Sequence, residues 1–144
     1  MTYTNKTQPT TITPEAYLKA LAPKNKQVLE DARALIAVYT KATGSPCVMW
    51  NKIFGFGSYE YADSKGGMHT HLMTGFAISS TGFTLYTMVG WKEYEQEIKK
   101  LGVYKLSGKS CLAIKNVAAI DLAVLGTIIK KSIAVMKKKY KTHK

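Results

Sequence analysis

Two histidines, His69 and His71, have the residue type and spacing best suited to chemistry in this chain. If their segment is a β-strand, both side chains leave the same face, about 6 to 7 Å apart. That separation suits two ligands of one divalent metal ion, or a general base. A metal site needs a third ligand, and the spacing of the sequence places none. Candidates by residue type alone are Cys47, Glu60, Asp63 and Cys111. We therefore expect a structural role for the histidines and no metal site, and keep metal binding and catalysis as alternatives.

Two glycine-containing stretches are similar to the motifs of nucleotide-binding loops, but neither has the required spacing of glycines. Gly55-Phe56-Gly57 would need its third glycine at position 60, where Glu60 stands, and a strand-like segment follows it. The stretch GVYKLSGKS, residues 102–110, has five residues between its glycines where a P-loop has four, and a strand follows it instead of a helix. We therefore expect the first pair of glycines to allow positive φ or close approach of backbone, and the second stretch to turn into a strand. No cofactor is predicted, and no catalytic motif favours an enzyme.

Aromatic residues are concentrated in the middle of the chain. They are Trp50, Phe54, Phe56, Tyr59, Tyr61, Phe76 and Tyr86. Such residues most often form the core, but several on one small sheet can also line a concave pocket for a small ligand. The leading functional hypothesis is binding of a small ligand or a protein partner through the sheet surface. The residues of that surface are Trp50, Tyr59, Tyr61, His69, His71 and Tyr86. The hypothesis requires a cleft beside these side chains.

The net charge of +12 is unevenly distributed. Residues 122–144 contain seven lysines and no acidic residue, and Arg33 is the only arginine. A lysine-rich surface holds nucleic acid non-specifically through its phosphates, whereas specific recognition usually employs arginine. Non-specific nucleic-acid binding is therefore the alternative hypothesis. It assigns binding to Lys130, Lys131, Lys137, Lys138 and Lys139.

Periodicity and capping signals predict the helices. Thr13, Pro14 and Glu15 are an N-cap, an N1 proline and a first-turn acid, and they start a helix that runs to about Leu21. After Pro23, apolar residues recur at helical spacing over residues 24–43, and Gly44 follows as C-cap. Helical spacing returns over residues 91–101 and over a long terminal helix, residues 118–140.

Between residues 47 and 89 the period changes to two, which predicts antiparallel strands joined by the turns DSKGG and STG. SCLAIK, residues 110–115, is a fifth strand. Strands grouped between helices predict an α+β fold with two layers, in which an antiparallel sheet of about five strands is packed by N-terminal, middle and long C-terminal helices.

The length of 144 residues indicates one domain, which we assign to residues 14–140, with a flexible leader at 1–13 and a basic tail at 141–144. The start of the chain lacks the pattern of a secretory signal, and the longest apolar run is too short to cross a bilayer. Two cysteines without CxxC spacing indicate buried thiols in a reducing cytoplasm. We expect a cytoplasmic protein that does not engage membranes.

Several segments together resemble the YdhG-like family, a domain of unknown function. They are PCVMWNKIFGFGSYEYADSKGG, TGFAISSTGFTLYTMVG and KKLGVYKLSGKSCLAIKNVAAIDLAVL, followed by the closing helix. The resemblance covers roughly residues 14–140. It implies a small α+β domain with helices packed on an antiparallel sheet, and it implies no established enzymatic activity.

Some relatives in that family have been likened to frataxin-type iron chaperones, which hold iron on a clustered acidic surface. The nine acidic residues of this chain are scattered, so an iron or metal chaperone is a disfavoured alternative. The family pattern also places a basic dipeptide near the third strand, where this chain has MHTHLMTGFAISS. If that dipeptide contacts an anionic ligand in relatives, this chain lacks the contact or replaces it with His69 and His71.

Overall fold

The computed structural model describes residues 9–21 and 26–144, and within them the chain forms an α+β fold. The α-helices are α1 (Pro14–Leu21), α2 (Lys26–Thr43), α3 (Glu95–Ile98) and α4 (Leu122–Lys139). The strands are β1 (Cys47–Trp50), β2 (Ile53–Ala62), β3 (Met68–Ser79), β4 (Gly82–Thr87), β5 (Lys105–Ser107), β6 (Cys111–Ile114) and β7 (Lys141–His143). Two short 3₁₀ helices, η1 (Trp91–Tyr94) and η2 (Val117–Ala119), precede α3 and α4. The predicted fold class is confirmed.

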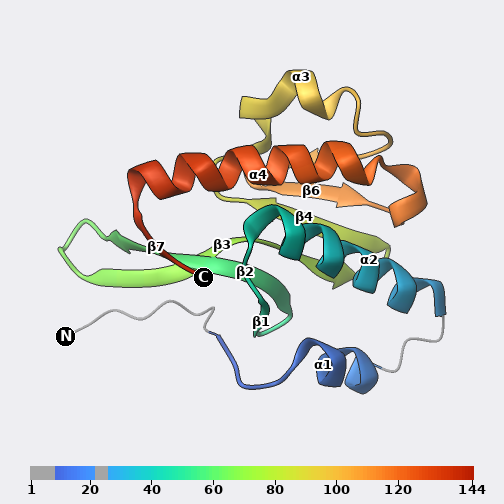
Figure 1. Ribbon diagram of the computed structural model, residues 1–144, viewed down its shortest axis with the longest axis horizontal. Helices are drawn as coiled ribbons and strands as arrows, with labels where there is room; N and C mark the ends of the chain where they lie inside the picture. Colours follow the sequence, from blue (N-terminus) through green and yellow to red (C-terminus); the bar gives the residue numbers. More distant parts are fainter. Residues whose placement is uncertain (1–8, 22–25) are drawn as a thin grey trace.

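All seven strands belong to one open antiparallel sheet, in the order β1-β2-β3-β4-β6-β5, with β7 also paired to β2. Helices α2 and α4 pack against each other and lie over one face of this sheet, as Figure 1 shows. Along β4 and β6 buried residues alternate with half-buried ones, because only one face of the sheet is covered by helices. No described helix has the length and hydrophobicity to span a membrane.

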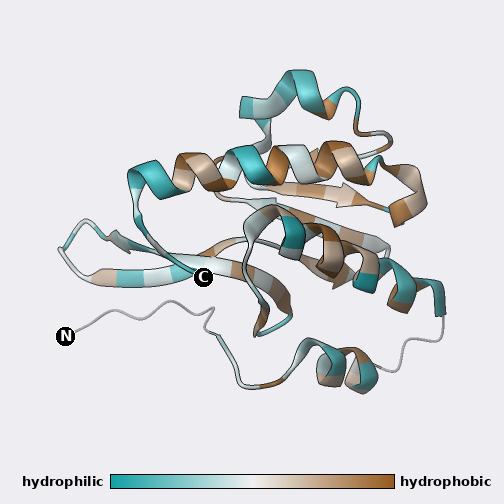
Figure 2. Cartoon of the chain, in the orientation of Figure 1, coloured by the Kyte–Doolittle hydropathy of each residue, from teal (hydrophilic) through white to brown (hydrophobic). Residues whose placement is uncertain are grey.

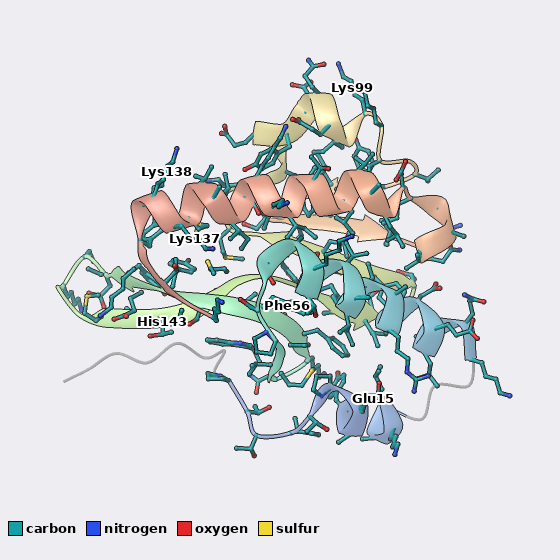
Figure 3. The ribbon with its side chains drawn as sticks, in the orientation of Figure 1. Glu15, Phe56, Lys99, Lys137, Lys138 and His143 are labelled. Carbon is teal, nitrogen blue, oxygen red and sulfur yellow. The ribbon has the colours of Figure 1, made fainter. Side chains whose placement is uncertain are left out.

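The core lies between the helices and the sheet and is built on stacked aromatic rings. Phe54 of β2 and Phe76 of β3 stack with ring centroids 4.6 Å apart, and Tyr39 of α2 packs on Phe56 at 5.1 Å. All four side chains are fully buried, and Figure 3 shows Phe56 beneath α2. In Figure 2, α4 is mainly hydrophobic in its first turns and hydrophilic in its last turn.

The first two helices follow the predicted signals. Thr13 Oγ1 accepts a hydrogen bond from Ala16 N–H at 3.1 Å and caps α1. Gly44 ends α2 with φ +69°, and its N–H donates to Thr40 O. The predicted restart at Pro23, with the two residues after it, lies outside the described residues.

The middle and terminal helices are shorter than predicted. The segment predicted as a helix over residues 91–101 is divided into η1 and α3, and α4 starts at Leu122 instead of residue 118. Side-chain caps explain the later start of α4. Asn116 Oδ1 accepts from Ala119 N–H, and Asp121 Oδ1 accepts from Ala123 and Val124 N–H. These bonds give acceptors to the N–H groups at the start of η2 and at the start of α4, so the segment forms two separate helical turns instead of one continuous helix.

Two strands, β5 and β7, were not predicted, and β7 corrects the assignment of residues 141–144 as a tail. Lys141, Thr142 and His143 pair with Glu60, Tyr59 and Ser58 of β2. The leader is likewise anchored at its described end, because Thr10 N–H and Thr10 Oγ1 both donate to Met49 O, at 2.7 and 3.0 Å. Thr10 and β7 therefore both contribute hydrogen bonds to the sheet region.

The cap of α4 gives a stability prediction. Replacing Asp121 with Ala leaves two helix N–H groups without their side-chain acceptor, and we expect a loss of about 1 kcal/mol in the free energy of unfolding. Urea denaturation measures it. Asp121→Asn keeps an acceptor oxygen and should retain most of the stability, so an equal loss in both variants would contradict the capping role.

Candidate functional site

The candidate site is the outer part of the β2–β3 hairpin, which we call the arm: residues 58–72, with the connecting turn at 63–67. In Figure 1 the arm extends past the last turn of α4. Antiparallel register places Tyr59 opposite His71 and Tyr61 opposite His69, so the four rings share one face. Tyr61 stacks on His69 with centroids 5.2 Å apart, and Tyr59 meets His71 edge-on at 6.2 Å.

His69 is a structural residue of the turn. Its side chain is 2% exposed, and Nε2–H donates to Asp63 Oδ2 at 2.7 Å. Asp63 Oδ1 also accepts from the N–H groups of Lys65 and Gly67, both at 2.8 Å. The hydrogen bond from His69 and these two backbone bonds hold the pKa of Asp63 below its usual value. The His69–Asp63 pair therefore fixes the conformation of the turn.

His71 lies between Trp50 and Tyr59, with ring centroids 6.0 Å from Trp50. Its Nδ1–H donates to Leu72 O at 3.0 Å. Burial lowers the pKa of His71, and the bond to Leu72 only partly opposes this effect. The imidazole is therefore held in its neutral form, which packs among aromatic rings without a desolvated charge.

The GFG glycines have the structural roles expected from the sequence. Trp50 lies over Gly55: a Cβ on Gly55 would come within 2.5 Å of Trp50 Cδ1. Gly57, at the base of the arm, has φ +70°, a conformation that side chains disfavour. Gly55 therefore makes room for Trp50, which is 4% exposed although it lies on the edge strand β1.

Tyr86 lies away from the arm, on β4. Its neighbours in the sheet are Gly75 of β3 and Cys111 of β6, and its side chain is on the face of the sheet that the helices leave open. Burial raises the pKa of the Cys111 thiol and raises that of Cys47 to about 12, and both thiols are free. The structure thus brings together Trp50 and the four rings of the arm and leaves Tyr86 on another part of the sheet.

Two of the candidate third ligands for a metal, Glu60 and Asp63, already form hydrogen bonds with histidines. Glu60 accepts a hydrogen bond from His143 Nε2–H of β7 at 2.6 Å, and Asp63 is bonded to His69. Within residues 9–21 and 26–144, no group of three or more His, Cys, Asp or Glu side chains is arranged to hold a metal ion.

A feature that the sequence did not indicate is the junction between the arm and the C-terminal segment. Tyr140, which follows α4, packs on Tyr59 with centroids 4.9 Å apart, and β7 then pairs with the arm. Burial, with smaller contributions from Tyr61 and Tyr140, raises the pKa of Tyr59 to about 12. The aromatic residues and the lysine-rich end of the chain, which suggested separate hypotheses, are neighbours in the fold.

The lysines predicted to hold nucleic acid are distributed around α4. Lys131 pairs with Glu97 of α3 at 2.6 Å, and Lys130 lines a hollow between α2 and α4. Lys138 follows the buried Met136 by two residues, about 200° around the helix, so it projects away from the sheet. Figure 3 shows Lys138 on the outer side of α4 and Lys137 on the side of the arm. Lys137 is therefore the lysine of α4 best placed to act with the arm.

Surface hollows lie beside the helices. Three hollows have volumes of about 360, 350 and 400 Å³, and residues of α2, α4, η1 and the loops around positions 89 and 109 line them, with Tyr140 at the end of α4. None of the six residues of the leading hypothesis lines them. The arm therefore offers a surface of half-buried rings, and these three hollows are lined by other residues, of which Tyr140 contacts the arm.

No protein-family model matches this chain, and neither does any curated protein or solved structure. The α+β fold is the one that the resemblance to the YdhG-like family implies, and membership of that family stays a prediction.

Two glycines should respond to alanine substitution with opposite changes in stability, because Trp50 packs on Gly55 whereas a methyl group fits beside Gly126. Gly55→Ala should lower the free energy of unfolding by about 1–3 kcal/mol, because the new methyl group displaces the indole. Gly126→Ala in α4 has no atom closer than 3.7 Å to the new Cβ and should add about 0.5–1 kcal/mol through helix propensity. Denaturant unfolding measures both, and a neutral Gly55→Ala would refute the close packing.

The neutral state of His71 gives a pH dependence. Its pKa is lower in the folded protein than the ordinary value near 6.5, so the unfolded chain takes up the proton first. The free energy of unfolding should therefore fall as the pH decreases from about 7 through the folded pKa of His71. Carboxylates with lowered pKa values, such as Asp63, protonate only below about pH 4, so they do not contribute in this range. An NMR titration of the His71 ring, with unfolding curves of wild type and His71→Gln, measures the effect. A His71 pKa above 6.5, or identical pH profiles, would show that burial does not control this group.

Proposed function

We propose that this protein is a non-enzymatic binding protein that holds single-stranded nucleic acid on the arm and the adjoining C-terminal segment. The observation that carries the proposal is the junction of Tyr140 with Tyr59 and the pairing of β7 with β2. This junction brings the lysine-rich end of the chain next to the aromatic rings of the arm. Proteins that bind single strands without sequence preference combine these two features, because bases stack on rings while cations meet phosphates.

The chemistry of the arm supports stacking more than a buried ligand site. Tyr59, Tyr61 and His71 are half-buried, and Tyr140 is 39% exposed. The neutral imidazole of His71 presents a ring without a charge. Each base stacked on such a ring contributes about 1–3 kcal/mol.

Exposed lysines adjoin the arm, and the strand register pairs Lys141 with Glu60, on the other face from Tyr59. Lys137, Lys141 and Lys144 are exposed, and they come from the last turn of α4, from β7 and from the residue after it. The two acidic residues of the arm, Glu60 and Asp63, each accept a hydrogen bond from a histidine. Lysines without arginine favour phosphate contacts that do not depend on sequence.

Two free, half-buried thiols fit a reducing compartment, so the proposal includes the cytoplasmic location expected from the sequence. A protein partner on the same surface is the competing outcome. It would be favoured by binding that depends on the rings but hardly on salt, because phosphate binding releases counterions.

The test is a fluorescence titration of labelled single-stranded DNA at several salt concentrations. Lys137→Glu/Lys141→Glu should weaken binding and reduce the slope of log K against log salt by about 1.4, the value for two lost phosphate contacts on a single strand. Tyr140→Leu should weaken binding about tenfold with an unchanged slope, because it removes stacking only.

The matched control is Lys99→Glu/Lys138→Glu, which makes the same change in net charge at positions that Figure 3 shows away from the arm. We expect this control to bind nearly as tightly as wild type. Equal weakening by both lysine pairs would attribute binding to overall charge and reject the arm, and the absence of salt-dependent binding would reject nucleic acid.

A further inference from the structure

A polar hollow of about 360 Å³ lies between η1, the loop before β6 and the C-terminal end of α4. Tyr94 of η1, Lys109 of the loop and Lys139 of α4 contribute its main donor groups, and Glu93 lines it as well. Met136 forms part of an apolar wall. Residues distant in sequence thus converge on one concave site, which Tyr140, packed on Tyr59 of the arm, also lines.

The hydroxyl of Tyr94 is the most informative group in this hollow. Tyr94 is 6% exposed, and its hydroxyl is a buried polar atom with no hydrogen-bond partner among the described residues. A buried hydroxyl without a partner is destabilising, and such groups are rare in folded proteins. Burial, with smaller contributions from Glu93 and Glu97, raises the pKa of Tyr94, so the group is a donor. An acceptor atom of a molecule in the hollow would satisfy it once the side chains that cover the hydroxyl move aside.

Lys109 is held in place by its surroundings. Trp91 N–H donates to Lys109 O at 3.2 Å, and Trp91 Nε1–H donates to Ser110 O at 2.9 Å. A Cβ on Gly90 would come within 3.1 Å of Lys109 Cγ and Cε, so the lysine stem lies across this glycine. The loop is therefore held against the start of η1, and the aliphatic stem of Lys109 lies beside Gly90 and lines the hollow.

A second hollow of about 350 Å³ adjoins the first, since Val89, Glu93 and Lys109 line both. Lys92 also lines this second hollow. Across the two hollows three lysines, Lys92, Lys109 and Lys139, face one carboxylate, that of Glu93. The excess of positive charge favours an anionic ligand, while the apolar wall accommodates a hydrocarbon body.

We propose that this hollow is a binding site for a small anion with an apolar body, a carboxylate or a phosphomonoester, whose acidic group lies between Lys109 and Lys139 and accepts a hydrogen bond from Tyr94. The hollow adjoins the arm through Tyr140, which lines it and packs on Tyr59, but the three residues that would contact the anion lie outside the arm, so variants of these residues test this site apart from nucleic-acid binding. The P-loop interpretation of residues 102–110 stays rejected, because Lys109 acts here through its side chain and strand β6 follows the loop.

The probes are phenyl phosphate, benzoate and inorganic phosphate, each titrated into the ¹⁵N-labelled full chain and followed by NMR. We expect saturable shifts of the Gly90, Tyr94 and Lys109 amides with at least one aromatic anion, and weaker binding of inorganic phosphate because it cannot use the apolar wall. The comparison of phenyl phosphate with benzoate identifies which acidic group the site prefers. Absence of saturable shifts with all three, or shifts spread over exposed lysines throughout the chain, would overturn the site.

Two variants test the contacts, and a third serves as the control. Tyr94→Phe removes only the hydroxyl and should weaken the bound probe about five- to tenfold, and Lys109→Met, which keeps the aliphatic stem, about tenfold or more. Lys105→Met, at an exposed position of β5 outside both hollows, is the matched control and should bind as wild type does. Lys139→Met replaces Lys109→Met if the latter does not fold. Equal affinity in Tyr94→Phe, Lys105→Met and wild type would overturn the assignment of the hydroxyl.

Discussion

The pairing of β2 with β3 is the interaction on which the rest of the structure depends. It runs from Ile53–Ala77 at one end to Ala62–Met68 at the other, and it gives the hairpin two different parts. The inner part carries the stacked Phe54 and Phe76 that anchor the helices. The outer part continues beyond the helical layer as the arm. Since register in a hairpin determines the face of every side chain, this one pairing decides both the core and the ring surface.

Local signals made most of the fold predictable. A Thr-Pro-Glu start, a glycine stop and apolar residues at helical spacing determine α1 and α2 with little help from the rest of the chain, and period-two patterning identifies the central strands. Long-range contacts account for what was not predicted. β5 is exposed along its length, and β7 consists of three polar residues, so neither strand has an apolar pattern in the sequence. Each becomes a strand because it pairs with a strand that has a free edge.

The candidate sites were less predictable than the fold, because residue type does not determine which strands are neighbours. Tyr59 and Tyr86 are the same residue type and both lie in strand-like segments, yet one packs on Tyr140 and the other lies beside Cys111. Tyr94 illustrates the same limit: helical spacing correctly indicates that it is buried, but only the fold shows that its hydroxyl has no partner among the described residues. Sequence patterns thus indicate burial, whereas hydrogen bonding depends on tertiary contacts.

The late position of β7 in the chain has a consequence for biosynthesis. His143 and its partner Glu60 are 83 residues apart, and the intervening chain includes most of the sheet and all of α4. At translation rates of about 5–20 residues per second, the outer edge of β2 waits roughly 4–17 s on the ribosome before β7 exists to pair with it. During that interval the arm presents an open strand edge beside exposed rings, which is the kind of surface that nascent-chain chaperones protect.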